Sequence, residues 1–286
     1  MTTHEGWPRL CLDLSHHAWT RDTSPDAPVR TLAHAEAADR AGIDVIWVNE
    51  DLDGWDAFAL LGAIAGRTSG AKLGTAVTTP FARHPNTLAS SVATLDRLSD
   101  GRMVLGIGRG QSEWLDHGLG LASRDGVAAL AETIRLLRQW WAPNHRASFA
   151  DGEVFPVRAW ERSLHPARPS IPILVAAVGP RALAMTADLA DGVMLNAMAS
   201  THAVRRIVSL LRERRAELGR PVAIDWVVLK TAITVTTSDE ETDRVLRRQR
   251  RVMAMINALP GMTSLIESPR WNIDEIMATV RQRLKV

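Results

Sequence analysis

The sequence predicts a single α/β domain, residues 1–286, folded as a parallel (β/α)8 (TIM) barrel. The chain has 286 residues, a length typical of one such barrel, and 46% of them are hydrophobic. Short apolar runs alternate with segments of helical periodicity almost to the end, and eight strand–helix units can be counted. This order implies parallel strands joined by right-handed crossovers, and eight units favour a closed barrel. An open doubly wound sheet stays the alternative on pattern alone, because no strict internal repeat decides between them.

The N-terminal half contains four of these units. The first helix is expected to stop at Gly42 and the third at the sequence Ser99-Asp100-Gly101, because glycine ends helices readily. The β-branched run at 43–48 is typical of a buried strand. In chain order we expect a strand at 9–14, a helix at 29–41, a strand at 43–48, a helix at 57–68, a strand at 72–78, a helix at 87–98, a strand at 103–107 and a helix at 127–141.

The C-terminal half is less regular. An insertion at 143–169 is rich in turn-prone and charged positions without helical periodicity, which is typical of a functional or mobile segment. The loop 110–126 follows a strand and is expected at the catalytic face of the barrel. The remaining expected elements are a strand at 171–177, a helix at 180–190, a strand at 193–195, a helix at 203–218, a strand at 224–236, a helix at 239–256, and a weak final pair, a strand at 262–266 and a helix at 273–284.

Composition limits the partners and the compartment. Lys and Arg total 34 and Asp and Glu total 32, and the net charge of +2 gives no reason to expect nucleic acid or a charged membrane as partner. Cys11 is the single cysteine, which excludes an intrachain disulfide and fits a reducing compartment. No stretch is apolar enough for a signal peptide or a membrane span, so a cytoplasmic protein is expected. No histidine cluster has metal-ligand spacing, and we expect no metal.

Two sequence blocks carry a family resemblance. Residues 72–110 read KLGTAVTTPFARHPNTLASSVATLDRLSDGRMVLGIGRG, and residues 173–195 read ILVAAVGPRALAMTADLADGVML. Their order and spacing resemble the luciferase-like flavin and deazaflavin oxidoreductases, and within them the branch that uses coenzyme F420. The similarity runs over roughly residues 33–218 and fades in the C-terminal quarter. It implies a luciferase-like barrel with F420 as cofactor, or FMN as the alternative.

The resemblance implies a set of cofactor-binding residues at the strand ends. The strand at 72–78 carries a bulge with a non-proline cis peptide in the family, which corresponds here to Ala76–Val77, with Thr78 beside it. Gly108, Arg109 and Gly110 correspond to a second wall of the cofactor site. Pattern alone allows simpler interpretations, core packing for the first segment and an ordinary turn for the second. The spacing of Gly106, Gly108 and Gly110 does not match a dinucleotide fingerprint.

A third segment is expected to hold the cofactor's phosphate-bearing tail. Pro180 suits the first position of a helix, where free N–H groups and the helix dipole favour anions. An ordinary helix start is the alternative. By resemblance the residues concerned are Ala176, Ala177, Val178, Gly179, Pro180 and Arg181.

The catalytic positions depart from the family pattern. Many deazaflavin relatives have a Ser-Asp-His triplet after the second strand, where this chain has Asn49-Glu50-Asp51. Glu50 and Asp51 are candidates to bind the ring or the substrate, and Asn49 to bind the cofactor. Gln111 stands where one relative has a Glu acid, and an amide cannot supply that proton. These departures put the relatives' specific reactions in doubt.

Histidine and tryptophan supply the remaining candidates. His16 and His17 follow the first strand and are the best candidates for a proton donor, although a surface role is the simpler interpretation for any single histidine. Trp55 lies a few residues past the second strand, where a family tryptophan often borders the ring. The chain has 10 Trp and no Tyr. Tryptophan walls suit an aromatic or heterocyclic substrate of the kind handled in secondary metabolism.

The leading hypothesis is an F420-dependent oxidoreductase. It transfers a hydride between the deazaflavin and a C=C, C=N or carbinol carbon of a small or medium organic substrate. The first alternative is an FMN-dependent monooxygenase of the same fold, and the second is a repurposed barrel without cofactor or redox activity. We also expect a homodimer, because the run 58–65 is apolar almost all round and relatives pair through this region.

Overall fold

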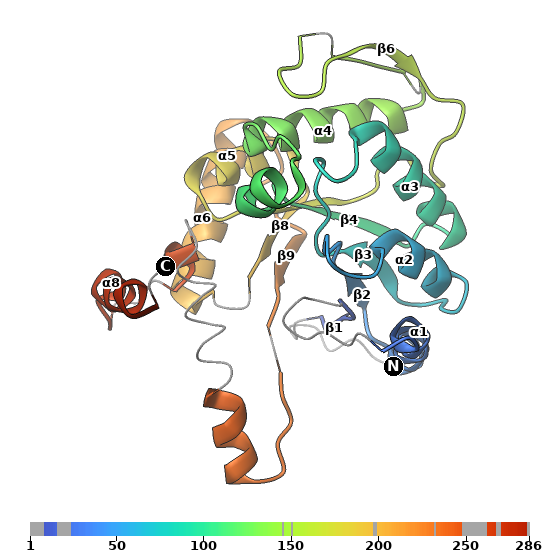
Figure 1. Ribbon diagram of the computed structural model, residues 1–286. Coiled ribbons are helices and arrows are strands. Elements are labelled where there is room, and N and C mark those ends of the chain that lie inside the picture. The colour runs from blue at the N-terminus through green and yellow to red at the C-terminus, as the bar shows by residue number, and fades with distance from the viewer. Residues whose placement is uncertain are drawn as a thin grey trace. The chain divides into compact units, whose positions relative to one another are not determined.

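The computed structural model describes residues 9–15, 24–144, 146–149, 151–196, 199–231, 233–247, 262–266 and 270–284. The chain divides into two compact units, residues 1–174 and 175–286. Each unit alternates strands with helices, as the sequence pattern predicts (Figure 1).

The first unit is built on four parallel strands in the order β1-β2-β3-β4. The register places Val45 beside Lys72 and Val48 beside Thr75, so the carboxyl ends of β2 and β3 lie level. Every residue of β2 and β4 is buried, as expected for strands covered on both faces. The strands are β1 (Cys11–Asp13), β2 (Val45–Val48), β3 (Lys72–Thr75) and β4 (Met103–Ile107).

Helices follow each of these strands (Figure 1). The Asp56 carboxylate accepts a hydrogen bond of 2.7 Å from the Ala59 N–H and so caps α2. Asp125 caps α4 in the same way through Val127 and Ala128. The helices are α1 (Ala27–Arg40), α2 (Ala57–Ala65), α3 (Pro85–Leu98) and α4 (Gly126–Trp141), with a short π-helix η1 (Glu113–Gly118) before α4.

The insertion at 143–169 contains an antiparallel hairpin. Strands β5 (Arg146–Phe149) and β6 (Val157–Glu161) pair with each other, and β5 packs against α4 (Figure 1). The buried Glu132 carboxylate on α4 accepts hydrogen bonds from the backbone N–H groups of Glu153, Val154 and Phe155. These contacts attach the insertion to the domain.

The second unit contains three strands in the order β7-β8-β9, and β8 and β9 are parallel. β7 begins two residues before the boundary between the units. The elements are β7 (Ile173–Ala176), α5 (Pro180–Leu189), β8 (Gly192–Leu195), α6 (Thr201–Glu217), β9 (Trp226–Leu229), a helix at 239–247, a 3-10 helix η2 (Met262–Leu265) and α8 (Ile273–Leu284).

Two strand predictions in this unit are wrong. The expected strand at 224–236 is limited to Trp226–Leu229, and its continuation is exposed, including Ile233 and Val235. The expected strand at 262–266 is the 3-10 helix η2. The carbonyl of Leu265 accepts a hydrogen bond of 2.7 Å from the Ser200 N–H at the start of α6, so that carbonyl binds a helix end and not a neighbouring strand. Strands therefore occupy seven of the eight expected positions among the described residues.

The apolar run behind the homodimer prediction lies on α2. Its large side chains Phe58, Leu60, Leu61 and Ile64 are buried within the first unit. Core packing thus accounts for most of its apolar character, and the homodimer stays a prediction. None of the described helices is long and apolar enough to cross a membrane.

Candidate active site

Asn49 joins the carboxyl ends of three strands. Its backbone N–H donates to the Ser15 hydroxyl, which follows β1, at 2.6 Å. Its side-chain Oδ1 accepts a hydrogen bond of 2.6 Å from the backbone N–H of Val77, which follows β3. The residue predicted to bind the cofactor from β2 therefore holds the neighbouring strand ends in register.

The segment after β3 has the backbone that the resemblance implies. The Ala76–Val77 peptide bond is cis, which confirms that prediction. The Ala76 N–H donates to the Val48 carbonyl at 3.0 Å, and the Val77 carbonyl accepts from the Glu50 N–H at 3.2 Å. On the other side, the Thr78 N–H donates to the Gly106 carbonyl at 3.1 Å, and its carbonyl accepts from the Gly108 N–H at 2.8 Å. Residues 76–78 are thus bonded to the ends of both β2 and β4.

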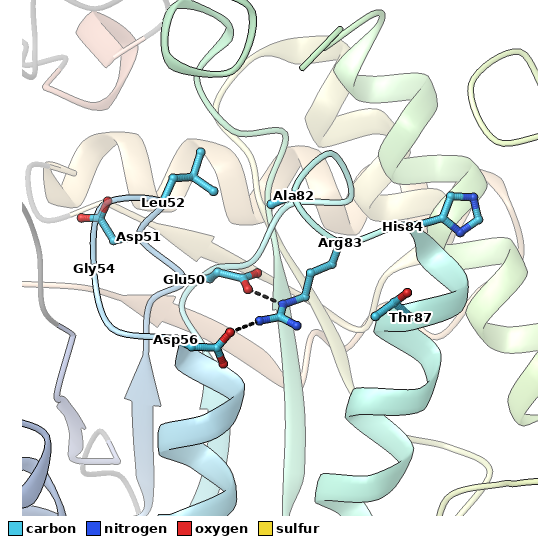
Figure 2. A pocket seen from close by; sticks show the side chains of 9 residues that line it. All are labelled: Glu50, Asp51, Leu52, Gly54, Asp56, Ala82, Arg83, His84 and Thr87. Atoms are coloured by element: carbon cyan, nitrogen blue, oxygen red, sulfur yellow. Dashed lines mark hydrogen bonds and ion pairs between the residues drawn. The ribbon is translucent and has the colours of Figure 1, made fainter. Parts of the chain in front are cut away.

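Arg83 connects Glu50 to the start of α2. Its guanidinium pairs with the carboxylates of Glu50 and Asp56 and lies 4.4 Å from the centre of the Phe58 ring (Figure 2). Burial acts to lower the pKa of Arg83, but the hydrogen bond and charge of Glu50, together with Asp56, outweigh it and raise that pKa. Sequence reasoning missed Arg83 as a site residue, although it lies inside the block 72–110 that carries the resemblance.

A pocket of about 430 Å³ opens beside this cluster. Asp51, like Glu50, lines it, and Figure 2 shows Asp51 turned away from Arg83. Burial lowers the pKa of His84, which favours its neutral ring at pH 7. The charged groups of the lining are then three carboxylates and one guanidinium. The lining residues are Glu50, Asp51, Leu52, Gly54, Asp56, Ala82, Arg83, His84 and Thr87.

The segment after β4 is held by its own packing. Gly108 is buried and Arg109 is exposed. Gly110 has a φ of +72°, and a Cβ there would lie 2.6 Å from Cδ1 of Leu115. This glycine is therefore required by the turn and by Leu115, a role that the sequence did not reveal. Gln111 is half-buried, and its carbonyl accepts from the Leu115 N–H at 3.0 Å at the start of η1.

The expected phosphate segment lies in the second unit. Ala176 ends β7, Ala177 is buried, and Val178 is half-buried. Gly179 precedes α5 without a side-chain cap, and Pro180 is the first residue of the helix. A Cβ added to Gly179 would meet no atom within 4 Å, so the space in front of this helix start is open. Arg181 is exposed in the first turn.

The other candidates are more scattered. His16 and His17 lie outside the described residues. Trp55 is 40% exposed in the connection between β2 and α2. The structure therefore brings together Asn49, Glu50, Val77, Thr78 and Gly108 in the first unit. No group of three or more His, Cys, Asp or Glu residues that could hold a metal ion occurs in the described parts of the chain.

The comparisons with known proteins identify the family. The model of the luciferase-like monooxygenase family matches residues 10–283. The chain belongs to this family. Its fold class is accordingly the luciferase-like α/β barrel, as the sequence predicted.

The names of curated relatives specify narrower activities. The chain is 31% identical over 164 residues to a 5,10-methylenetetrahydromethanopterin reductase from Archaeoglobus fulgidus, a match covering 57% of this chain and 48% of that protein. It is 29% identical over 248 residues to an F420-dependent glucose-6-phosphate dehydrogenase from Nakamurella multipartita, covering 82% of this chain and 71% of the relative. The chain thus spans about half the length of the first of these relatives.

A solved structure supports the same fold. A type II Baeyer-Villiger monooxygenase, the oxygenating constituent of 3,6-diketocamphane monooxygenase from Pseudomonas putida in complex with FMN, superimposes with a TM-score of 0.72 at 15% identity. The match covers 96% of this chain and 86% of that one. At this identity the similarity concerns the fold alone.

Proposed function

We propose that this protein is an F420-dependent oxidoreductase that transfers a hydride between the deazaflavin and a small or medium organic substrate. The observation that carries the proposal is the convergence of Asn49, Val77, Thr78 and Gly108, which are hydrogen-bonded across three adjacent strand ends. These are positions at which the family resemblance expects the cofactor ring. Curated relatives that are named as F420-dependent enzymes favour this cofactor.

The residues present are compatible with such a cofactor. The polar backbone groups of Val77 and Thr78 bond to neighbouring protein groups, so they need no partner from a ligand. Val77 itself is half-buried and offers apolar surface for a planar ring. In the second unit, the open space before α5 and the uncapped N–H groups of its first turn suit a phosphate. The cofactor, when bound, would supply the carbon that accepts or donates the hydride.

The chain itself would supply binding, orientation and a proton. Both oxygens of Glu50 are already hydrogen-bonded, one to Arg83 and one to Thr78. Asp51 lines the pocket with a carboxylate, and we assign proton exchange with the substrate to Asp51 on that placement. The protein would hold the reacting atoms of cofactor and substrate at about 3–3.5 Å.

A second candidate function is an FMN-dependent monooxygenase, favoured by the FMN-bound structural neighbour. Fluorescence titrations of the purified protein with F420 and with FMN separate the candidates. We expect F420 to bind more tightly than FMN. Tighter binding of FMN, with oxygen consumption, would favour the monooxygenase. Binding of neither cofactor would favour a barrel without redox activity.

The tail of the cofactor provides a residue-level test. We expect Arg181→Ala to weaken F420 binding by about 1–3 kcal/mol, the contribution of hydrogen bonds to a charged group. Gly179→Val should weaken it more, because the added side chain would occupy the open space before α5. Arg212→Ala, on the exposed surface of α6, is the matched control and should leave the dissociation constant unchanged. Equal dissociation constants in all four proteins would contradict the phosphate assignment.

A further inference from the structure

Arg83 is held by groups from two neighbouring segments. Its side chain, 19% exposed, comes from the connection between β3 and α3. It pairs with Glu50 at the end of β2 and with Asp56 at the start of α2, and it stacks on Phe58 of α2. Asp56 also caps α2 through the Ala59 N–H. One guanidinium therefore links the connection between β3 and α3 to the end of β2 and to the start of α2 (Figure 2).

Glu50 transmits this link to the candidate cofactor site. Its side chain is 9% exposed, with Oε1 accepting from Arg83 and Oε2 from the Thr78 hydroxyl. Its backbone N–H donates to the Val77 carbonyl at 3.2 Å. The position of residues 77–78 thus depends on Glu50, and the position of the Glu50 carboxylate depends on Arg83.

We propose that Arg83 is a positioning residue, which acts through Glu50 to fix Val77 and Thr78 where the cofactor ring is to bind. The inference rests on the proposed function for the identity of the ligand. It assigns Glu50 to structural support and not to proton transfer.

The side chains of the Arg83–Glu50 pair are only 19% and 9% exposed. Removing one partner of a largely buried ion pair leaves the other charge without compensation, which costs much more than the loss of an exposed pair. Arg67 and Glu36 form an exposed pair at 3.1 Å in the same unit, with side chains 51% and 32% exposed. Arg67→Met is therefore a matched control for the loss of an arginine–glutamate pair.

The first test uses hydrogen–deuterium exchange of the full chain without cofactor. In Arg83→Met we expect exchange in peptides covering residues 49–54 and 76–83 to accelerate roughly tenfold, a change of about 1.4 kcal/mol in opening free energy. Glu50→Gln should accelerate the same peptides. Arg83→Lys should give an intermediate effect, because an ammonium lacks the planar fork of the guanidinium. Arg67→Met should leave both peptides unchanged.

The second test measures F420 binding to the same four variants and the wild type. We expect the dissociation constant to rise about tenfold in Arg83→Met, less in Arg83→Lys, and not at all in Arg67→Met. Unchanged exchange at 49–54 and 76–83, or equal acceleration throughout the first unit, would overturn the positioning role. If the wild type binds neither F420 nor FMN, the proposed function is overturned. Faster exchange confined to residues 49–54 and 76–83 in Arg83→Met would still support the role of Arg83 in holding Val77 and Thr78.

Discussion

His84 combines a structural role with a place in the pocket wall. Its Nδ1 accepts a hydrogen bond of 3.2 Å from the Asn86 N–H and so caps α3. Its ring meets Phe155 of the insertion edge-on, with the centroids 5.4 Å apart. Capping requires an unprotonated nitrogen, and burial lowers the pKa of this ring. The neutral form is therefore the one that the fold prefers.

This preference predicts a pH dependence of stability. The folded-state pKa of His84 lies below its unfolded value. At pH values between the two, the unfolded chain therefore binds more protons than the folded one. Its contribution is complete above about pH 6.5, the usual histidine pKa, and declines as the pH falls through and below that value. His84→Asn keeps a good capping residue and removes the titration. Denaturant unfolding at about pH 7.5 and pH 5.5 should show a smaller loss in His84→Asn than in wild type. An equal loss in both proteins would contradict the assignment.

Gly74 in β3 allows Trp47 of β2 to pack inside the first unit. An added Cβ would lie 2.2 Å from Cζ3 of Trp47 and 2.9 Å from the Val104 carbonyl oxygen, and Trp47 is only 3% exposed. Gly74→Ala should therefore lower the free energy of unfolding by about 1–3 kcal/mol, or prevent folding. Gly179→Ala is the control, because a Cβ there meets nothing within 4 Å. Urea unfolding that shows equal effects of the two substitutions would refute this packing argument.

The candidate site was only partly predictable from single residues. The resemblance correctly indicated the cis Ala76–Val77 bond, because a motif fixes local backbone. The ion pairs of Arg83 were not evident from the sequence. Its partners Glu50 and Asp56 lie about 30 residues earlier in the chain and meet it only through strand pairing. Gly110 was predicted as part of a cofactor wall, and the packing of Leu115 that leaves no space for a side chain there depends on the fold of η1.

At the scale of elements, the insertion at 143–169 is attached by buried polar groups at several points. The fully buried Asp96 on α3 pairs with Arg168 at 3.1 Å, and Arg162 donates to the Asn86 carbonyl at 3.0 Å. Glu132 holds the segment before β6. The sequence suggested a functional or mobile segment, because turn-prone residues reveal neither the hairpin nor its distant acceptors on α3 and α4.

Glu132 should therefore be important for the stability of the insertion. Glu132→Ala removes the acceptor of three partly buried backbone N–H groups, and we expect the free energy of unfolding to fall by about 2–4 kcal/mol. Glu132→Gln retains one acceptor oxygen and should have a smaller effect. Glu213→Ala, on the exposed surface of α6, is the control and should be nearly neutral. Chemical denaturation measures all three, and a Glu132→Ala protein as stable as the wild type would exclude this role.

The periodicity of the sequence predicted α1 to α6 with errors of a few residues at their ends. It failed after β9, where an apolar run is not paired as a strand in the described residues. The β-branched residues of 230–236 continue the pattern of β9, but in the described residues the strand ends at Leu229. Local sequence cannot reveal this, because pairing depends on which other segment lies alongside.

For the whole molecule, the boundary between the two compact units falls inside a strand. Residues 1–174 and 175–286 meet within β7, where Ile173, Leu174 and Val175 are fully buried. Boundaries between independent domains usually lie in exposed, flexible linkers. The single domain that the sequence predicts stays a prediction, and the cooperativity of unfolding tests it.

This placement predicts that the chain unfolds in one cooperative transition. Far-ultraviolet circular dichroism and tryptophan fluorescence should give coincident melting curves, and the calorimetric and van't Hoff enthalpies should agree. Leu174→Ala should lower the free energy of unfolding by about 2–5 kcal/mol, as expected for a buried leucine, and should shift both curves together. Leu210→Ala, at a position 42% exposed on α6, is the control and should shift them little. Two separate transitions, with Leu174→Ala affecting only one, would instead mean that each unit folds around a core of its own.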